Sequence, residues 1–214
     1  MLRLGWHGHS CWELRSEERS LVLDPHDGRS VGIQPPTVRA DYVVITHDHF
    51  DHSAVRAVEK TGGGTHVMTG PLKGTPAGSF GVTEFASWHD GVGGMARGPN
   101  RMIMVEVSGI RVLHLGDLGH ELDSVQLRAL GTPDILLVPA GEVFTLGAEE
   151  AWRTIAALGP RIVAPMHYKT PGLGLPVHEL ESFLQGRDVV SMGQSVELEP
   201  EDLPPELEVW QFNR

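Results

Sequence analysis

A short apolar run at 42–46 is followed at once by four side chains of the kind that bind metal ions. The next six residues read His-Asp-His-Phe-Asp-His. Residues two apart on a strand end project to the same side, so His47 and His49 can bind one ion together. Asp51 and His52 lie in the turn that follows, where the chain can direct them to a second point nearby. Zinc and similar divalent metals accept imidazole and carboxylate ligands, so this pattern predicts a metal site at the end of a buried strand. The alternative is a histidine-rich surface turn without metal.

Four further residues of suitable chemistry follow strand-like runs elsewhere in the chain: Asp24 before Pro25, His89 after 83–88, Asp117 after Gly116, and His167 after 161–165. Together with the hexapeptide, these landmarks resemble, in type and in order, the metallo-β-lactamase fold superfamily over roughly residues 1 to 198. The opening Gly5-Trp6-His7-Gly8-His9-Ser10 and the compact length are most similar to uncharacterised metal-dependent hydrolases related to ascorbate-6-phosphate lactonase. They are somewhat similar to the N-acylphosphatidylethanolamine phospholipase D group.

The resemblance implies a site with two divalent metal ions, with zinc expected and manganese, iron or nickel as the other candidates. It implies one ligand set for each ion and one bridging carboxylate: His47, His49 and His89 for the first, Asp51, His52 and His167 for the second, and Asp117 between them. Water shared by two such ions is deprotonated near pH ~7 and becomes a nucleophile. We therefore expect catalytic roles for Asp51, Asp117 and His120, with Asp51 or His120 as the proton donor to the leaving group.

Other polar residues are candidates for supporting roles. Asp24 is expected to orient a histidine of the motif, because ligating histidines usually donate their second N–H to a carboxylate; an ordinary turn aspartate is the alternative. His7 and His9 share the turn after the first strand, and His9 is a candidate to bind substrate or to protonate the leaving group. A hydrogen-bonded loop histidine is the alternative for both. Arg97 is the one cation of the glycine-rich loop 90–100. It is a candidate to bind an anionic substrate group, with a solvated arginine as the alternative.

The charge balance argues against two classes of partner. The chain has 17 Lys and Arg against 28 Asp and Glu, a formal net charge of −11 at pH 7. Nucleic acids and anionic membranes require a basic surface, so we expect neither, and expect an anionic small-molecule substrate instead. Cys11 is the only cysteine, which excludes an intrachain disulfide and a thiolate zinc cluster. No apolar run approaches the ~18 residues of a membrane helix, and a cytoplasmic location is expected.

The order of the predicted elements indicates an α/β (α+β) fold. Helices are expected at 53–60, 124–130, 148–158 and 177–184, with strands dominating the first half. This order suits a four-layer αββα sandwich of the metallo-β-lactamase type with the metal site at one edge. One domain over 1–214 is expected, because the composition shows no break or linker. Its last part, 199–214, is an acidic C-terminal extension with a possible strand at 208–212. This extension either packs on the body or mediates contacts, and a homo-oligomer is possible.

Four functions compete on these grounds. A metal-dependent hydrolase of a small ester, lactone or phosphoester fits best. A phosphodiesterase or nuclease of the same superfamily is weakened by the acidic charge. A diiron redox protein would normally need a flavin-binding domain, for which 214 residues leave no room. A non-enzymatic metal-dependent binding module is the fourth.

Overall fold

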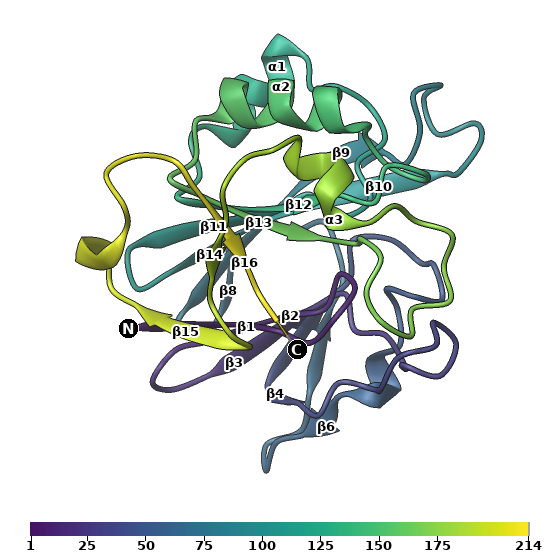
Figure 1. Ribbon diagram of the computed structural model, residues 1–214. Helices are drawn as coiled ribbons and strands as arrows, with labels where there is room; N and C mark the ends of the chain where they lie inside the picture. Colours follow the sequence, from purple (N-terminus) through teal and green to yellow (C-terminus); the bar gives the residue numbers. More distant parts are fainter. Residues whose placement is uncertain (214) are drawn as a thin grey trace.

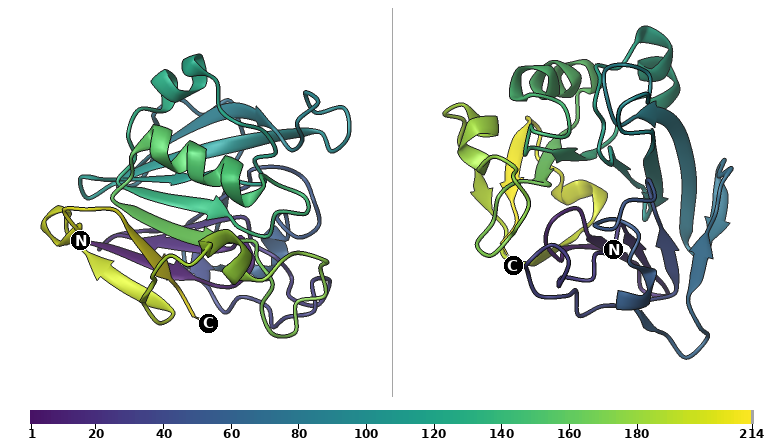
Figure 2. Two further views of the ribbon diagram at one scale, coloured as in Figure 1. Left: turned by 45° about the horizontal axis from the view of Figure 1, so that its top comes forward. Right: turned by 90° about the vertical axis from the view of Figure 1, so that its right-hand side faces the viewer.

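Two β-sheets face each other in the computed structural model, which describes residues 1–213 (Figures 1 and 2). The first sheet has the order β15-β1-β2-β3-β5-β7. Its strands are β1 (Leu2–Trp6), β2 (Trp12–Arg15), β3 (Ser20–Leu23), β5 (Tyr42–Val44), β7 (His66–Met68) and β15 (Ser195–Leu198). The second has the order β14-β16-β13-β12-β11-β10-β9-β8. Its strands are β8 (Thr75–Ala77), β9 (Phe80–Trp88), β10 (Pro99–Val107), β11 (Ile110–His114), β12 (Ile135–Pro139), β13 (Ile162–Met166), β14 (Val190–Ser191) and β16 (Glu208–Gln211).

Two helices cover the outer face of the second sheet. They are α1 (Ser124–Leu130) and α2 (Ala148–Leu158), at the top of Figure 1, and α3 (Leu180–Leu184) packs beside α2. Asp123 begins α1 by accepting hydrogen bonds from the backbone N–H groups of Val125 and Gln126. The buried positions of α2 recur three and four residues apart, as expected for a helix with one face on a sheet. The predicted α/β class with stacked sheets is thereby confirmed.

The prediction of a helix at 53–60 is wrong. The chain forms only a 3₁₀ turn, η1 (Val55–Ala57), and then β6 (Glu59–Lys60), which pairs with β4 (Arg39–Ala40). Val55 and Val58 pack against the outer face of the first sheet. Because β-branched residues fit an extended, half-buried segment well, tertiary packing overrides the helical pattern here. The helix expected at 177–184 is also shorter than predicted, because it begins only at Leu180. Val177 lies in the loop before it and packs in an apolar cluster of loop residues.

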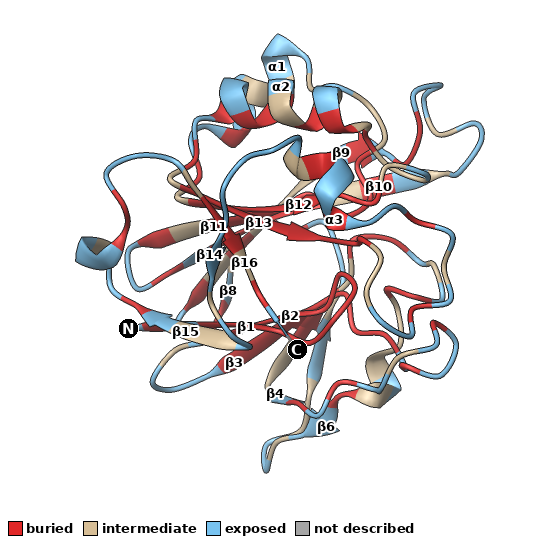
Figure 3. Ribbon diagram, in the orientation of Figure 1, coloured by how far each residue is buried: buried red, intermediate tan, exposed pale blue. Residues whose placement is uncertain are grey.

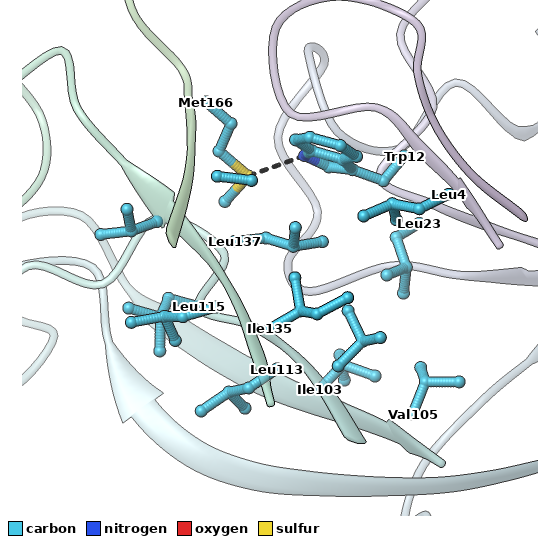
Figure 4. Packing of buried hydrophobic residues seen from close by; sticks show 14 of the residues in the cluster. Leu4, Trp12, Leu23, Ile103, Val105, Leu113, Leu115, Ile135, Leu137 and Met166 are labelled. Carbon is cyan, nitrogen blue, oxygen red and sulfur yellow. Dashed lines mark hydrogen bonds between the residues drawn. The ribbon is translucent and has the colours of Figure 1, made fainter. Parts of the chain in front are cut away.

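The core fills the space between the sheets. Figure 3 shows the facing strands as almost continuously buried, and Figure 4 shows Leu4, Trp12 and Leu23 of the first sheet opposite apolar residues of the second. The indole N–H of Trp12 reaches Met166 Sδ at 3.3 Å, which joins β2 to β13. All residues of β12 and β13 are buried, as is usual for parallel strands covered on both faces.

The acidic C-terminal segment belongs to the body of the molecule. After the 3₁₀ turn η2 (Pro200–Asp202), β16 runs parallel to β13, and the Phe212 ring lies 5.0 Å from that of Trp12. The strand predicted at 208–212 is thereby confirmed. The prediction of one domain over 1–214 stays a prediction. Within residues 1–213 no helix has the length and apolar character needed to cross a membrane.

Candidate metal centre

Strand ends bring the candidate ligands to one edge of the sandwich. β9 and β11 are both antiparallel to β10, so both end at the same edge, and β12 and β13 run parallel to β11. His89, Asp117 and His167 follow β9, β11 and β13 at that edge. In the first sheet, β5 runs parallel to β3 and leads into the hexapeptide. Residues far apart in sequence therefore converge without any one loop having to hold them all.

Among the described residues three groups of ligand-type side chains form: one consists of Asp24, His47 and His52, and the other two together hold the candidate ligands apart from Asp117. His47, His49 and His89 bring one nitrogen each within 4.8 Å of one another, and so do the ligand atoms of His9, Asp51, His52 and His167. Except for His49, which is partly exposed, all members are buried. Three of the rings in the first group contact one another, with centroids 4.5 to 4.9 Å apart.

Asp117 lies between the two groups. Its Oδ2 is 3.1 Å from His89 Nε2, 3.3 Å from His52 Nε2 and 3.2 Å from His167 Nε2. His47 Nε2 is 3.8 Å away. The carboxylate is thus in reach of nitrogens from both groups, which is the arrangement that a bridging ligand requires.

The donor set fits divalent metal ions. Among the described residues, His47 Nε2, His52 Nε2 and Asp117 Oδ1 are buried and lack a hydrogen-bond partner. Buried polar atoms without a partner are rare, because each costs ~1–3 kcal/mol. Nitrogens and carboxylate oxygens that converge without hydrogen-bond geometry are what a metal ion would use.

Burial prepares two of these histidines for metal binding. Burial lowers the pKa of His9 and of His47 to about 3, so both rings are neutral at physiological pH. Burial alone would raise the pKa of Asp117, but His167 and His52 hold it well below its ordinary value. His52 is the exception, because Asp117 and Asp24 outweigh its burial and raise its pKa well above the ordinary value. A metal ion at His52 must therefore displace a proton.

Asp24 is held against the hexapeptide. Its Oδ2 accepts from His52 Nδ1–H at 2.7 Å and from the Thr46 hydroxyl at 2.6 Å, and its Oδ1 accepts from the Thr46 N–H at 2.7 Å. The side chain is fully buried. These contacts place Asp24 where the sequence analysis expected it, behind a histidine of the motif.

Several backbone positions at the site are strained. His9, Asp24 and His167 have φ values of 51°, 44° and 55°, in the left-handed region that non-glycine residues rarely adopt. Gly116 has φ 57°, and a Cβ there would lie 2.3 Å from Asn100 Oδ1. The Asn100 oxygen instead accepts from the Asp117 N–H at 3.1 Å. Glycine at 116 is therefore required for the turn that presents Asp117.

Comparison with known proteins decides the family. A sequence profile described as the beta-lactamase superfamily domain matches residues 3–167. A solved structure from Thermotoga maritima, described as a Zn-dependent hydrolase of the metallo-β-lactamase superfamily, covers 99% of each chain with a TM-score of 0.78 and 28% identity. The chain belongs to the metallo-β-lactamase superfamily. Its relatives include a metal-dependent hydrolase from Methanoculleus marisnigri, 31% identical over 227 residues with 94% of this chain and 98% of that protein covered. Another, from Archaeoglobus fulgidus, is 28% identical over 195 residues with 79% and 84% covered.

This metallo-β-lactamase superfamily member is a metal-dependent hydrolase, as predicted. His9 differs from its expected place, however. It is fully buried within the second ligand group, with Nε2 3.0 Å from Asp51 Oδ2, rather than on a surface that a substrate reaches. Its neighbour His7 faces away from the ligands and pairs with Glu13 at 3.1 Å. The sequence could not separate these two histidines, because it does not give the direction of the turn.

The catalytic role expected for His120 is not supported by its contacts. Its Nε2 accepts from the Trp88 N–H at 3.2 Å, and its Nδ1 donates to the Glu121 carbonyl at 2.9 Å. With both nitrogens bound to backbone, the ring has no free proton for a leaving group. In this hydrolase His120 therefore ties its own loop to the strand end that carries His89.

Arg97 contacts another loop of the hydrolase. Its guanidinium lies over the Phe144 ring, 4.6 Å from the centroid. Phe144 follows β12 and Arg97 follows β9, so the contact passes over the ends of β10 and β11, where Asp117 lies. No carboxylate lies within 4.0 Å of this guanidinium in residues 1–213.

Sequence reasoning missed Asp90. Its carboxylate accepts hydrogen bonds of 2.7 to 2.9 Å from the backbone N–H groups of Val92, Gly94, Ala96 and Arg97. These N–H groups hold the pKa of Asp90 at about 2 although its partial burial opposes the charged form. The glycines of the loop were a signal that the backbone folds tightly here, but nothing in the sequence named the acceptor.

Proposed function

We propose that this hydrolase binds two divalent metal ions, most readily zinc, and cleaves an ester, lactone or phosphoester bond of a small anionic molecule. The observation that carries the proposal is the position of Asp117, whose Oδ2 lies 3.1 to 3.3 Å from histidines of both ligand groups. When bound, the ions would supply an activated water near neutral pH and polarise the oxygen of the scissile group.

The chain's own residues perform the other tasks. Asp117 and the histidines around it would hold the ions. Asp51 is 7% exposed, and although burial opposes its charge, His9 and His52 hold the pKa of its carboxyl well below the ordinary value, so it would serve the second ion as an ionised ligand. Burial of the site keeps its dielectric low, which strengthens each of these interactions.

The proposed substrate is anionic. Two divalent ions against the carboxylates of Asp24, Asp51 and Asp117 would leave a local charge of about +1, opposite in sign to the whole chain. Arg97 adds a cation without a carboxylate partner at the same edge. Phe50 and Met95, on the loops that carry the ligands, are 58% and 85% exposed, so apolar surface borders the site. A small organic molecule with one anionic group suits these surroundings.

Two measurements test the proposal. Elemental analysis of protein purified without chelator is expected to give about two metal equivalents per chain, and one equivalent or none after reconstitution contradicts the two-metal site. Turnover of paired carboxylic esters, lactones and phosphodiesters with zinc or manganese then identifies the bond class.

A phosphodiesterase or nuclease is the second candidate function, and cleavage of oligonucleotides in preference to small esters would favour it. Metal binding with no turnover of any substrate class would favour a binding module.

Neither nucleic acid nor membrane is a proposed partner. Association into a homo-oligomer is tested by light scattering.

A further inference from the structure

His9 occupies a position that the superfamily resemblance did not assign to metal chemistry. Its Nε2 lies 3.0 Å from Asp51 Oδ2, and its ring centroid lies 4.3 Å from that of His167 and 5.3 Å from that of His52. Its side chain is fully buried. A buried imidazole beside three candidate ligands of one ion requires a physical account.

The fold holds the His9 backbone firmly. The turn between β1 and β2 places His9 at φ 51°, and its carbonyl accepts from the Trp6 indole N–H at 2.9 Å and from the His167 N–H at 3.1 Å. The same residue therefore joins the first sheet to the backbone of a candidate ligand from the second. An anchored imidazole is suited to fix a partner that is less well held.

Asp51 is such a partner. It lies in the turn after His49, and among residues 1–213 only His9 hydrogen-bonds its carboxylate. His52 Nε2 is the next candidate, but at 3.7 Å from Asp51 Oδ2 it is too far for a hydrogen bond. Without His9, nothing in the described chain determines how the Asp51 carboxylate is rotated.

The geometry points to His9 as the residue that orients Asp51: it donates Nε2–H to Oδ2 and so fixes the rotation of the carboxylate beside His52 and His167. This inference rests on the proposed two-metal site. His52 and His167 each bring Nε2 within 3.3 Å of Asp117 Oδ2, whereas no nitrogen of His9 lies within 4.0 Å of that carboxylate. His9 belongs to the same ligand group, but its nearest polar contact is Asp51 and not the bridging carboxylate, which is the arrangement of a positioning residue.

The same turn provides a matched control. His7 is buried two residues away and pairs through Nε2 with the Glu13 carboxylate at 3.1 Å, but neither residue of that pair is in a ligand group. Truncation of His7 therefore removes a histidine–carboxylate contact of the same kind from the same turn. Any effect specific to the metal position must be absent from His7→Ala.

The test is a cobalt(II) titration of full-length protein, followed by visible absorbance, for wild type, His9→Ala, His9→Gln and His7→Ala. We expect His9→Ala to weaken one of the two binding steps by ~10–100-fold and to leave the other unchanged. Glutamine retains an N–H donor at a similar reach, so His9→Gln should stay within a few-fold of wild type with an unchanged spectrum. On an Asp51→Ala background, His9→Ala should add no further loss.

Each other outcome overturns the inference. Equal losses for His9→Gln and His9→Ala, with an altered cobalt spectrum, would make His9 a ligand, and equal losses for His7→Ala and His9→Ala would make the effect structural. Unchanged affinity in His9→Ala would leave Asp51 oriented by something else. A wild-type protein that binds one cobalt ion contradicts the proposed two-metal function itself, and His9 would then have no second ion to serve. If His9→Ala does not fold, nitrogen-15 NMR of metal-free wild type decides, because the inference requires the Nε2–H tautomer and an Nδ1–H tautomer contradicts it.

Discussion

His52 donates its Nδ1–H to Asp24 Oδ2 at 2.7 Å, although the two residues lie 28 positions apart in the chain. The contact exists because β3 and β5 run parallel and end together, Leu23 beside Val44. It fixes the His52 tautomer, so Nε2 remains as the nitrogen that faces the Asp117 carboxylate. Asp24 therefore holds the ring of a candidate metal ligand from behind.

Replacing Asp24 is expected to weaken metal binding without removing a ligand. Asparagine keeps the shape and tolerates the positive φ, but it presents an N–H₂ group to donors that need an acceptor. We expect Asp24→Asn to lower metal affinity and kcat/KM by ~10–100-fold. Isothermal titration with zinc measures the first and a turnover assay the second. Asp27→Asn is the control, since Asp27 bonds only to Ser30 among the groups described. Wild-type affinity in Asp24→Asn would reduce Asp24 to a turn residue.

The metal-free protein is expected to lose stability as the pH falls below ~6.5. Burial lowers the pKa of His9 and His47 to about 3, whereas in the unfolded chain these rings titrate near ~6.5. Between pH ~6.5 and ~3 only the unfolded state takes up these protons. The free energy of unfolding therefore decreases as the pH falls, by at most ~1.4 kcal/mol per pH unit for each ring. The raised pKa of His52 has the opposite effect, because its contribution to stability is lost as the pH rises, but this occurs only above pH ~6.5. Urea unfolding in chelator across this range is the measurement, and a flat profile contradicts the prediction.

The strand ends that carry the ligands could be predicted because apolar runs followed by polar residues are local signals. The fold followed from their order. The conformation of segment 53–60 could not be predicted, because Val55 and Val58 suit a helical pattern as well as an extended one. Packing against the outer face of the first sheet decides between the two. The directions of His9 and His120 stayed open in the sequence for a related reason. Whether a loop histidine faces the ligands depends on backbone angles, such as φ 51° at His9, that single residues do not reveal.

Asp90 is expected to keep the loop after His89 folded. Asp90→Ala removes the acceptor of four backbone N–H groups, so the loop should become mobile while the metal ligands remain. Hydrogen exchange of residues 92 to 97 should accelerate, and KM should rise more than kcat falls. Asp123→Ala, which removes a comparable acceptor at the start of α1, controls for general loss of stability. Unchanged exchange at 92 to 97 would show that the loop folds without Asp90.

His120→Ala is expected to affect folding more than catalysis. The ring accepts from the Trp88 N–H and donates to the Glu121 carbonyl, so its loss should cost ~0.5–1.5 kcal/mol per hydrogen bond in the free energy of unfolding. Metal content should be unchanged and kcat should stay within a few-fold of wild type. Unfolding curves and turnover on one preparation measure both. A loss of kcat of ~100-fold with normal stability would restore His120 as a proton donor.

Arg97 is expected to select anionic substrates. Its guanidinium is held over the Phe144 ring and has no carboxylate partner in residues 1–213, so a bound anion would gain a charge-assisted hydrogen bond without displacing an existing one. Arg97→Ala should lower kcat/KM ~10-fold or more for an ester with a carboxylate or phosphate group and leave its neutral analogue unchanged. Arg97→Lys should recover only part of the loss, because lysine lacks the planar group that stacks on Phe144. Arg128→Ala, at an exposed arginine of α1, is the control. Equal losses for charged and neutral esters would mean that Arg97 shapes the loop and does not recognise the anion.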